Sequence, residues 1–198
     1  MTRWALALVP CLVLAGCTKK QAPIGYDPVS PNAPTRAEAP PTGGGGVDFG
    51  ATLAGARAKC TADQGAFSQS GKVSTCVTHH TELGATLITL VQYCGGAACR
   101  IHTVLILERP DATSWLVPFA HLRGQLLEKF GDPDQNDTKF PADCKQDFAG
   151  CVKSGEASAL LRWSWDDGHA VMLRIGPIKQ IPAAISVSYS DSHGAAEH

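Results

Sequence analysis

Two stretches of the chain carry hydrophobic residues at helical spacing, and each is bordered by residues that begin or end helices. The first follows Thr52, a good N-cap, and leads to Gly65, which suits a helix exit. Its spaced apolar residues are Leu53, Ala56 and Cys60. The second is introduced by residues 111–114 and ends at Gly131, with Pro118 expected in its first turn or before a later start. Its apolar stripe consists of Trp115, Phe119, Leu122, Leu126 and Phe130.

Six runs rich in Val, Ile, Leu and Thr predict β-strands, three after each helix. They cover residues 73–80, 85–93, 100–108, 159–165, 169–175 and 184–189. Asp-Asp-Gly at 166–168 is typical of a tight hairpin turn, and residues 132–156 are expected to form a loop. The order α-β-β-β-α-β-β-β suggests two diverged copies of one unit. We therefore expect an α+β two-layer sandwich, in which two αβββ repeats pack two helices on one face of an antiparallel sheet.

Residues 1–16 have the pattern of a secretory signal. Arg3 precedes an apolar stretch over residues 4–14, which is too short to span a bilayer because spanning needs about 20 apolar residues. The stretch ends in Leu-Ala-Gly-Cys at positions 14–17. This ending resembles the bacterial lipoprotein lipobox, which implies that Cys17 is lipidated and that its acyl chains hold the protein to a lipid bilayer. Thr18 follows the cysteine, and the resemblance then implies sorting to the outer membrane.

Residues 17–47 comprise the predicted lipidated Cys17 and a segment rich in residues that break helices and strands. Between positions 18 and 47 there are six prolines and five glycines, four of them consecutive at 43–46. Such a segment buries little apolar surface, so we expect a flexible tether. The folded domain is then expected over residues 48–191, with a loose tail at 192–198.

Four short motifs of the folded domain resemble those of the BamE and beta-lactamase-inhibitor-protein-like superfamily of envelope proteins. They are Phe-Gly-Ala-Thr at 49–52, Lys-Phe-Gly-Asp-Pro at 129–133, Trp-Ser-Trp-Asp-Asp-Gly at 163–168 and Ile-Ser-Val-Ser-Tyr at 185–189. The resemblance implies a module that scaffolds or inhibits other proteins. One position departs from the pattern, since Gly55 stands where the family often has an acidic residue that closes a capping box.

Six cysteines lie between the predicted anchor and the C-terminus, an even number in an oxidising compartment, which predicts three disulfides. Six cysteines allow fifteen pairings, and their spacing favours local ones. Cys94 with Cys99 and Cys144 with Cys151 are close in sequence, which leaves Cys60 with Cys76. The gaps do not fit the short paired spacing of zinc modules.

Charge and motifs exclude several functional classes. The formal net charge of −1 gives no bulk attraction to nucleic acid. We find no catalytic or nucleotide-binding motif and predict no enzyme activity, cofactor or resident metal. His79, His80 and Glu82 are interpreted as a polar strand end, although they could contribute to a surface metal site. Three aspartates at 132–137 have only half the pattern of a calcium loop.

Trp163 and Trp165 share one face of a predicted strand, and we expect both to lie in the core beneath the helices, with an aromatic stacking platform as the alternative. Strand residues of the opposite parity then face away from the helices. Large side chains predicted on that outer face are Arg100, His102, Arg162, Met172 and Arg174. Arginine and methionine are enriched at protein interfaces, so we predict that these five bind a partner.

These observations together predict a lipid-anchored, non-enzymatic lipoprotein of the cell envelope that binds or scaffolds another envelope protein. A small-molecule or cell-wall binding module is the first alternative, and an enzyme with an unrecognised site is the second.

Overall fold

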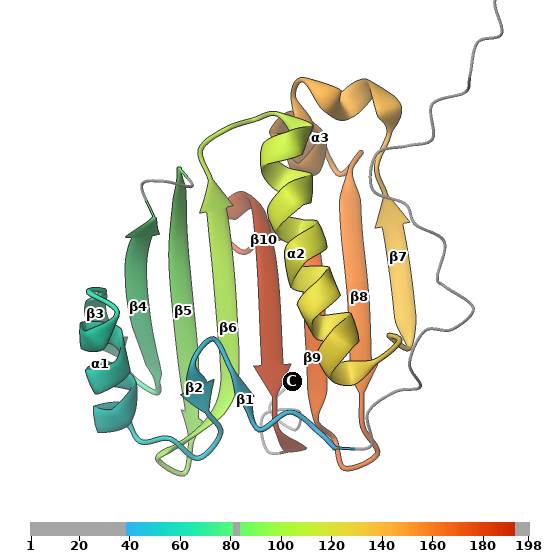
Figure 1. Ribbon diagram of the computed structural model, residues 1–198. Helices are drawn as coiled ribbons and strands as arrows, with labels where there is room; N and C mark the ends of the chain where they lie inside the picture. The colour runs from blue at the N-terminus through green and yellow to red at the C-terminus, as the bar shows by residue number, and fades with distance from the viewer. Residues whose placement is uncertain (1–38, 81–83, 193–198) are drawn as a thin grey trace, which may run out of the picture.

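An eight-stranded antiparallel sheet organises the fold, in the spatial order β3-β4-β5-β6-β10-β9-β8-β7 (Figure 1). The computed structural model describes residues 39–80 and 84–192 of the chain. The strands are β3 (Ala66–Ser70), β4 (Val73–His80), β5 (Ala85–Cys94), β6 (Ala97–Leu107), β7 (Gln135–Lys139), β8 (Ser158–Ser164), β9 (Ala170–Ile178) and β10 (Ile181–Ser190). The first four strands form one meander and the last four another, and β6 pairs with β10 where the two meet.

The α+β class is confirmed, but the predicted arrangement of two αβββ repeats, each with one helix and three strands, is not. Each half of the sheet contains a fourth strand, β3 or β7, at its outer edge. The sequences Ala-Phe-Ser-Gln-Ser and Gln-Asn-Asp-Thr-Lys of these strands are almost entirely exposed. Exposed edge strands need no apolar alternation, and polar edges prevent unwanted pairing with other chains. The hydrophobic pattern therefore could not predict these two strands.

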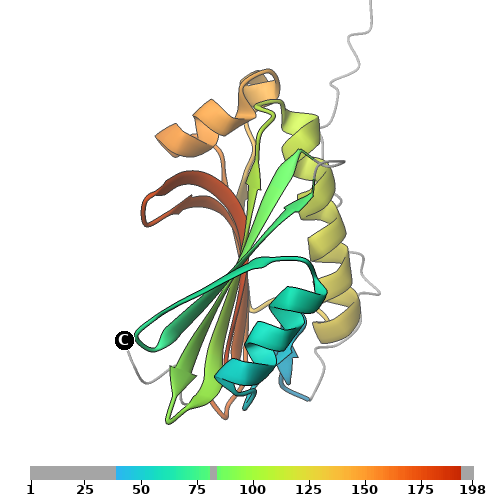
Figure 2. The same cartoon turned by 90° about the vertical axis from the view of Figure 1, so that its left-hand side faces the viewer.

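Helices α1 (Leu53–Ala62) and α2 (Ala112–Phe130) lie on the same face of the sheet (Figure 2). Thr52 caps α1, because its side chain accepts a hydrogen bond of 3.2 Å from the Gly55 N–H. Asp111 caps α2 by accepting from the Ser114 N–H at 3.0 Å. The helix begins at Ala112, which places Pro118 in its second turn rather than its first.

A third helix lies in the stretch that we predicted as a loop. After β7 the chain forms a 3-10 helix, η2 (Ala142–Lys145), and then α3 (Phe148–Ser154), which is capped by Asp147. Phe148 packs against Trp115 of α2, with ring centroids 6.0 Å apart. Seven residues are too few to show helical periodicity, so tertiary packing rather than local pattern stabilises this helix.

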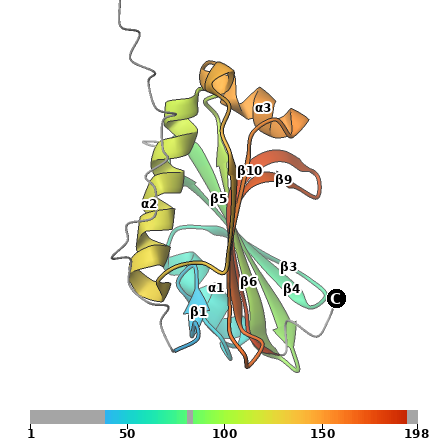
Figure 3. The same cartoon turned by 90° about the vertical axis from the view of Figure 1, so that its right-hand side faces the viewer.

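The main core lies between α2, α3 and the second half of the sheet. Trp163 is fully buried there, and its indole Nε1–H donates to the carbonyl of Gly131 at 2.9 Å, which confirms its predicted core position. A smaller cluster beneath α1 includes Val47, Tyr93 and Ile101. Both clusters occupy the helix-covered face, which leaves the opposite face of the sheet without a helical layer (Figures 2 and 3).

The four consecutive glycines form part of a hairpin that crosses the sheet between α1 and α2 (Figure 1). Its strands are β1 (Gly43–Gly44) and β2 (Val47–Asp48). Gly44 lies against the Tyr189 ring so closely that a Cβ there would overlap the ring. Gly45, at φ 57°, lies over the hydroxyl of Thr103. This end of the predicted tether is packed on the domain, because glycine lets the backbone approach the sheet.

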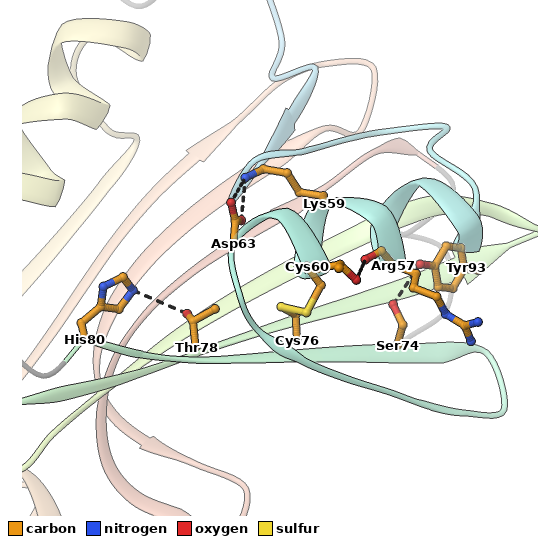
Figure 4. Close-up of a disulfide and its surroundings, with 10 residues drawn as sticks. Arg57, Lys59, Cys60, Asp63, Ser74, Cys76, Thr78, His80 and Tyr93 are labelled. Carbon is orange, nitrogen blue, oxygen red and sulfur yellow. Dashed lines mark hydrogen bonds and ion pairs between the residues drawn. A yellow bond between two sulfur atoms is a disulfide. The ribbon is translucent and has the colours of Figure 1, made fainter.

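The three disulfides have the pairing that the spacing favoured. Cys60 joins Cys76, and Cys94 joins Cys99, each with a Cα–Cα distance of 5.7 Å. Cys144 joins Cys151 at 6.0 Å. Figure 4 shows the first of them holding α1 to β4, beside the ion pair of Lys59 and Asp63 on α1.

Several predicted features lie outside the described residues. These are the signal over residues 1–16, the lipidated Cys17, most of the tether and nearly all of the tail. Among the described helices, none is long and apolar enough to cross a membrane.

Candidate functional site

The five predicted partner-binding residues lie on the sheet face opposite α1 and α2. Alternation along the strands places them there: Arg162 is exposed, while its neighbours Leu161 and Trp163 have no exposed surface. On β6, the fully buried Ile101 separates Arg100 from His102 in the same way. We call this uncovered side the outer face.

Strand pairing places most of these side chains in adjacent rows across the sheet. One row runs from His102 on β6 through Ser188 on β10 and Met172 on β9 to Arg162 on β8. The next row runs from Arg100 through Ser190 and Ala170 to Ser164. Small residues on β10 therefore lie between larger, basic residues on either side.

This arrangement forms a groove of about 540 Å³ on the outer face. Four of the five predicted residues line it: Arg100, His102, Arg162 and Met172. Arg174 lies in the adjoining row, beside Ser186. A groove could not be read from the sequence, because its two sides belong to β6 and β8, which come from different halves of the chain.

Two further groove residues, Trp165 and His169, were not predicted to bind a partner. Trp165 was expected in the core but is only partly buried, because it follows the last residue of β8. One side of its ring packs edge-on against Phe130, with centroids 5.4 Å apart, while the residue also lines the groove. Trp165 thus contributes an aromatic side chain to the groove, whereas Trp163 lies in the core.

The tight turn between β8 and β9 holds His169 in place. The backbone N–H of Trp165 donates to the His169 carbonyl at 2.9 Å, as the predicted hairpin turn requires. Asp167 Oδ1 accepts from the His169 backbone N–H at 3.0 Å and lies 2.9 Å from its imidazole Nδ1. These contacts, the backbone one first, hold the pKa of Asp167 below its usual value. In the sequence, only the Asp-Asp-Gly motif, which predicted the turn, indicated that Asp167 and His169 lie close together.

Positive charges converge around His102. Burial lowers the pKa of this imidazole, and the nearby charges of Lys179, Arg100 and Arg174 lower it further. Lys179 belongs to the turn between β9 and β10, a hairpin that curls away from α2 toward the outer face (Figure 2). Three cations from β6, β9 and this turn therefore act on the same imidazole, in addition to its burial.

Two acidic residues that contact groove-lining residues, Asp134 and Asp167, are engaged in local interactions. Asp134 Oδ2 accepts a hydrogen bond of 2.6 Å from the backbone N–H of Ser164. Asp167 is held by His169, as described above. Among the described residues, Arg162, Arg174 and Lys179 form no ion pair. The outer face of this net-acidic protein thus carries a locally positive surface.

One further cluster of candidate metal ligands occurs among the described residues, at the Cys144–Cys151 disulfide. The Cys144, Cys151 and Glu156 side chains approach within 4.8 Å of one another, but the two sulfurs are joined in a disulfide and offer no thiolate. His79 contacts the Thr86 hydroxyl at 3.0 Å and His80 contacts that of Thr78 at 3.5 Å. Glu82 lies outside the described residues.

No protein-family model, curated protein or solved structure matches the chain.

Proposed function

We propose that this protein is a lipid-anchored, non-enzymatic module of the cell envelope that binds or scaffolds another envelope protein through its outer face. One observation carries the proposal: four of the five residues that strand parity and side-chain type predict line a single groove on the uncovered side of the sheet. Antiparallel sheets with one solvated face normally present mainly small polar and charged side chains there. Here the face is hollowed and presents arginine, methionine and tryptophan, the side chains that interfaces favour.

The proposed anchor and the domain would act together. The lipobox resemblance supports lipidation at Cys17, and residues 18–38 are long enough to separate the domain from the bilayer on the order of 25 Å. Outer-membrane sorting follows from the same resemblance. In each half a helix, α1 or α2, precedes four antiparallel strands, although η2 and α3 separate β7 from β8 in the second half. This order supports the proposed resemblance to the BamE and beta-lactamase-inhibitor-protein-like superfamily and, with it, an origin from two related units.

A small molecule is the second candidate ligand, favoured by the size of the groove. Its volume of about 540 Å³ falls within the ~300–1,000 Å³ of typical ligand sites. Such sites are mostly apolar and enclosed, whereas this groove lies on an open sheet face and combines Met172 and Trp165 with arginine, histidine and serine. The protein partner therefore remains the preferred proposal.

The test is site-specific crosslinking in cells that produce the lipidated protein. A photoreactive residue in place of Met172 should give a discrete adduct with one envelope protein. The same residue in place of Val117, which is 62% exposed on α2, is the matched control and should give no such adduct. Adding Arg162→Glu and Arg174→Glu should abolish the adduct, with little change in thermal stability. Adducts from Val117 alone would place the binding surface on the helical side and refute the proposal.

Cys17→Ser tests the anchor separately. This variant should move from the membrane fraction to the soluble fraction with its domain still folded. Retention in membranes washed with high salt would refute lipid anchoring.

A further inference from the structure

We propose that the groove binds an extended, acidic peptide segment of the partner protein. Carboxylates of the segment lie against Arg162 on one side and against the cations around His102 on the other, which are Arg100, Arg174 and Lys179. This inference depends on the proposed function and specifies the chemistry of its partner. It follows from the width of the groove, the nature of its floor and its charge.

The width of the groove requires a ligand longer than a single small anion. His102 and Arg162 occupy the same row but are separated by β10 and β9, which is three strand spacings. At about 4.8 Å per spacing, their backbones lie about 14 Å apart. An extended peptide advances about 3.3 Å per residue, so roughly four or five residues reach from one side to the other.

The floor of the groove suits a peptide backbone. It is formed by Ser188, Ser190 and Ala170, whose short side chains let another chain approach the sheet. Serine hydroxyls both donate and accept, so they can pair with the N–H and C=O groups of a bound segment. Met172 and the exposed side of Trp165 add apolar surface for the side chains between the carboxylates.

Charge decides the composition of the segment. Arg162, Arg174 and Lys179 form no ion pair among the described residues, and Arg174 and Lys179 both act on His102. An acidic segment would supply the missing negative charges, and arginine forms two parallel hydrogen bonds with a carboxylate. A bilayer surface fits less well, because the curled β9–β10 hairpin makes the outer face concave (Figure 2), whereas a bilayer is flat.

Arg174 offers a test of position as well as charge. Its guanidinium lies over Gly176, where an added Cβ would come within 3.0 Å of Nε. Gly176→Ala should therefore shift the guanidinium by a few tenths of an ångström without removing its charge. Gly176 has an ordinary negative φ, so alanine fits its backbone.

The experiment measures binding of a fluorescein-labelled decapeptide of glutamate to the full-length protein in detergent, by fluorescence anisotropy at low salt. Arg162→Gln with Arg174→Gln should weaken binding at least tenfold, and Gly176→Ala should weaken it about threefold. Arg123→Gln with Lys129→Gln removes the same charge from α2, on the other side of the sheet, and should change binding less than twofold. A lysine decapeptide should not bind, and citrate should compete only at far higher concentration than the glutamate peptide.

Equal binding by the wild type and the Arg162/Arg174 variant would overturn the inference, as would full competition by phosphatidylglycerol vesicles at matched charge. Citrate competing as well as the peptide would assign the groove to a small anion instead. If the glutamate peptide does not bind while Met172 still crosslinks an envelope protein in cells, the proposed function holds and the acidic segment is wrong. If neither occurs, both proposals fail.

Discussion

Gly44→Ala should destabilise the protein by about 2 kcal/mol, because the glycine hairpin is packed on the sheet. A Cβ at this position would overlap the Tyr189 ring, far inside the 3.4–4 Å of ordinary contact. Either the ring must turn or β1 must move away from the sheet. Forcing extra atoms into a packed site typically costs about 1–3 kcal/mol.

The apolar surface that the hairpin buries sets an upper limit on the loss of folding stability. Val47 on β2 is only 8% exposed and packs in the cluster beneath α1. Full burial of a valine contributes about 1.5–3 kcal/mol, which is the ceiling if the hairpin detaches. The hydrogen bond from the Gly50 N–H to the Ala98 carbonyl, at 2.9 Å, would still hold the chain that follows. The loss should therefore remain local to the hairpin.

Urea and thermal unfolding of the full-length chain measure this change, with an expected fall in melting temperature of about 4–8 °C. Gly124→Ala is the matched control, because a Cβ there meets no atom within 4 Å. It lies within α2 and should stabilise the protein by about 0.5–1 kcal/mol. In a Tyr189→Ala background, Gly44→Ala should cost much less. An unchanged cost in that background, or no cost in the wild type, would show that the Tyr189 ring is not the reason why position 44 requires glycine.

Three further predictions concern the core, the groove and the disulfides. Trp163→Phe should cost about 2–4 kcal/mol in urea unfolding, because it leaves the buried Gly131 carbonyl unpaired and opens a cavity; a cost below 1 kcal/mol would contradict this. The pKa of His102 is lowered in the folded state, so the unfolded chain binds more protons and stability should fall as pH falls from 6.5 toward the lowered value. His102→Gln should flatten this slope, and an unchanged slope would assign it to another group. Replacing Cys60 and Cys76 with serine should lower the free energy of unfolding by about 3 kcal/mol, since they close a loop of 16 residues. A thiol-labelling reagent should modify none of the six domain cysteines of the denatured, unreduced wild type.

Features that depend on neighbouring residues were predictable from the sequence. Thr52 caps α1, and the bounds of β4 agree with the prediction. The predicted stripe of α2 is buried except for the partly buried Leu122. Helix and strand periods are local properties of the chain, so the sequence pattern contains them. The same alternation placed Arg162 and Arg174 on the outer face. The cysteine pairing followed from short separations of 5 and 7 residues for two of the three disulfides.

Features that depend on distant contacts were decided by the tertiary structure. The polar edge strands β3 and β7 form because neighbouring strands offer unpaired N–H and C=O groups, which no local pattern records. The local pattern of four glycines predicts a tether. In the tertiary structure their backbone lies close against Tyr189 and Thr103, an approach that glycine allows because it has no Cβ. The groove exists because β6 pairs with β10 and joins the two halves of the sheet, while the turn carrying Lys179 curls toward the outer face. The sequence alone determined which side chains face outward, and long-range strand pairing determined which of them meet.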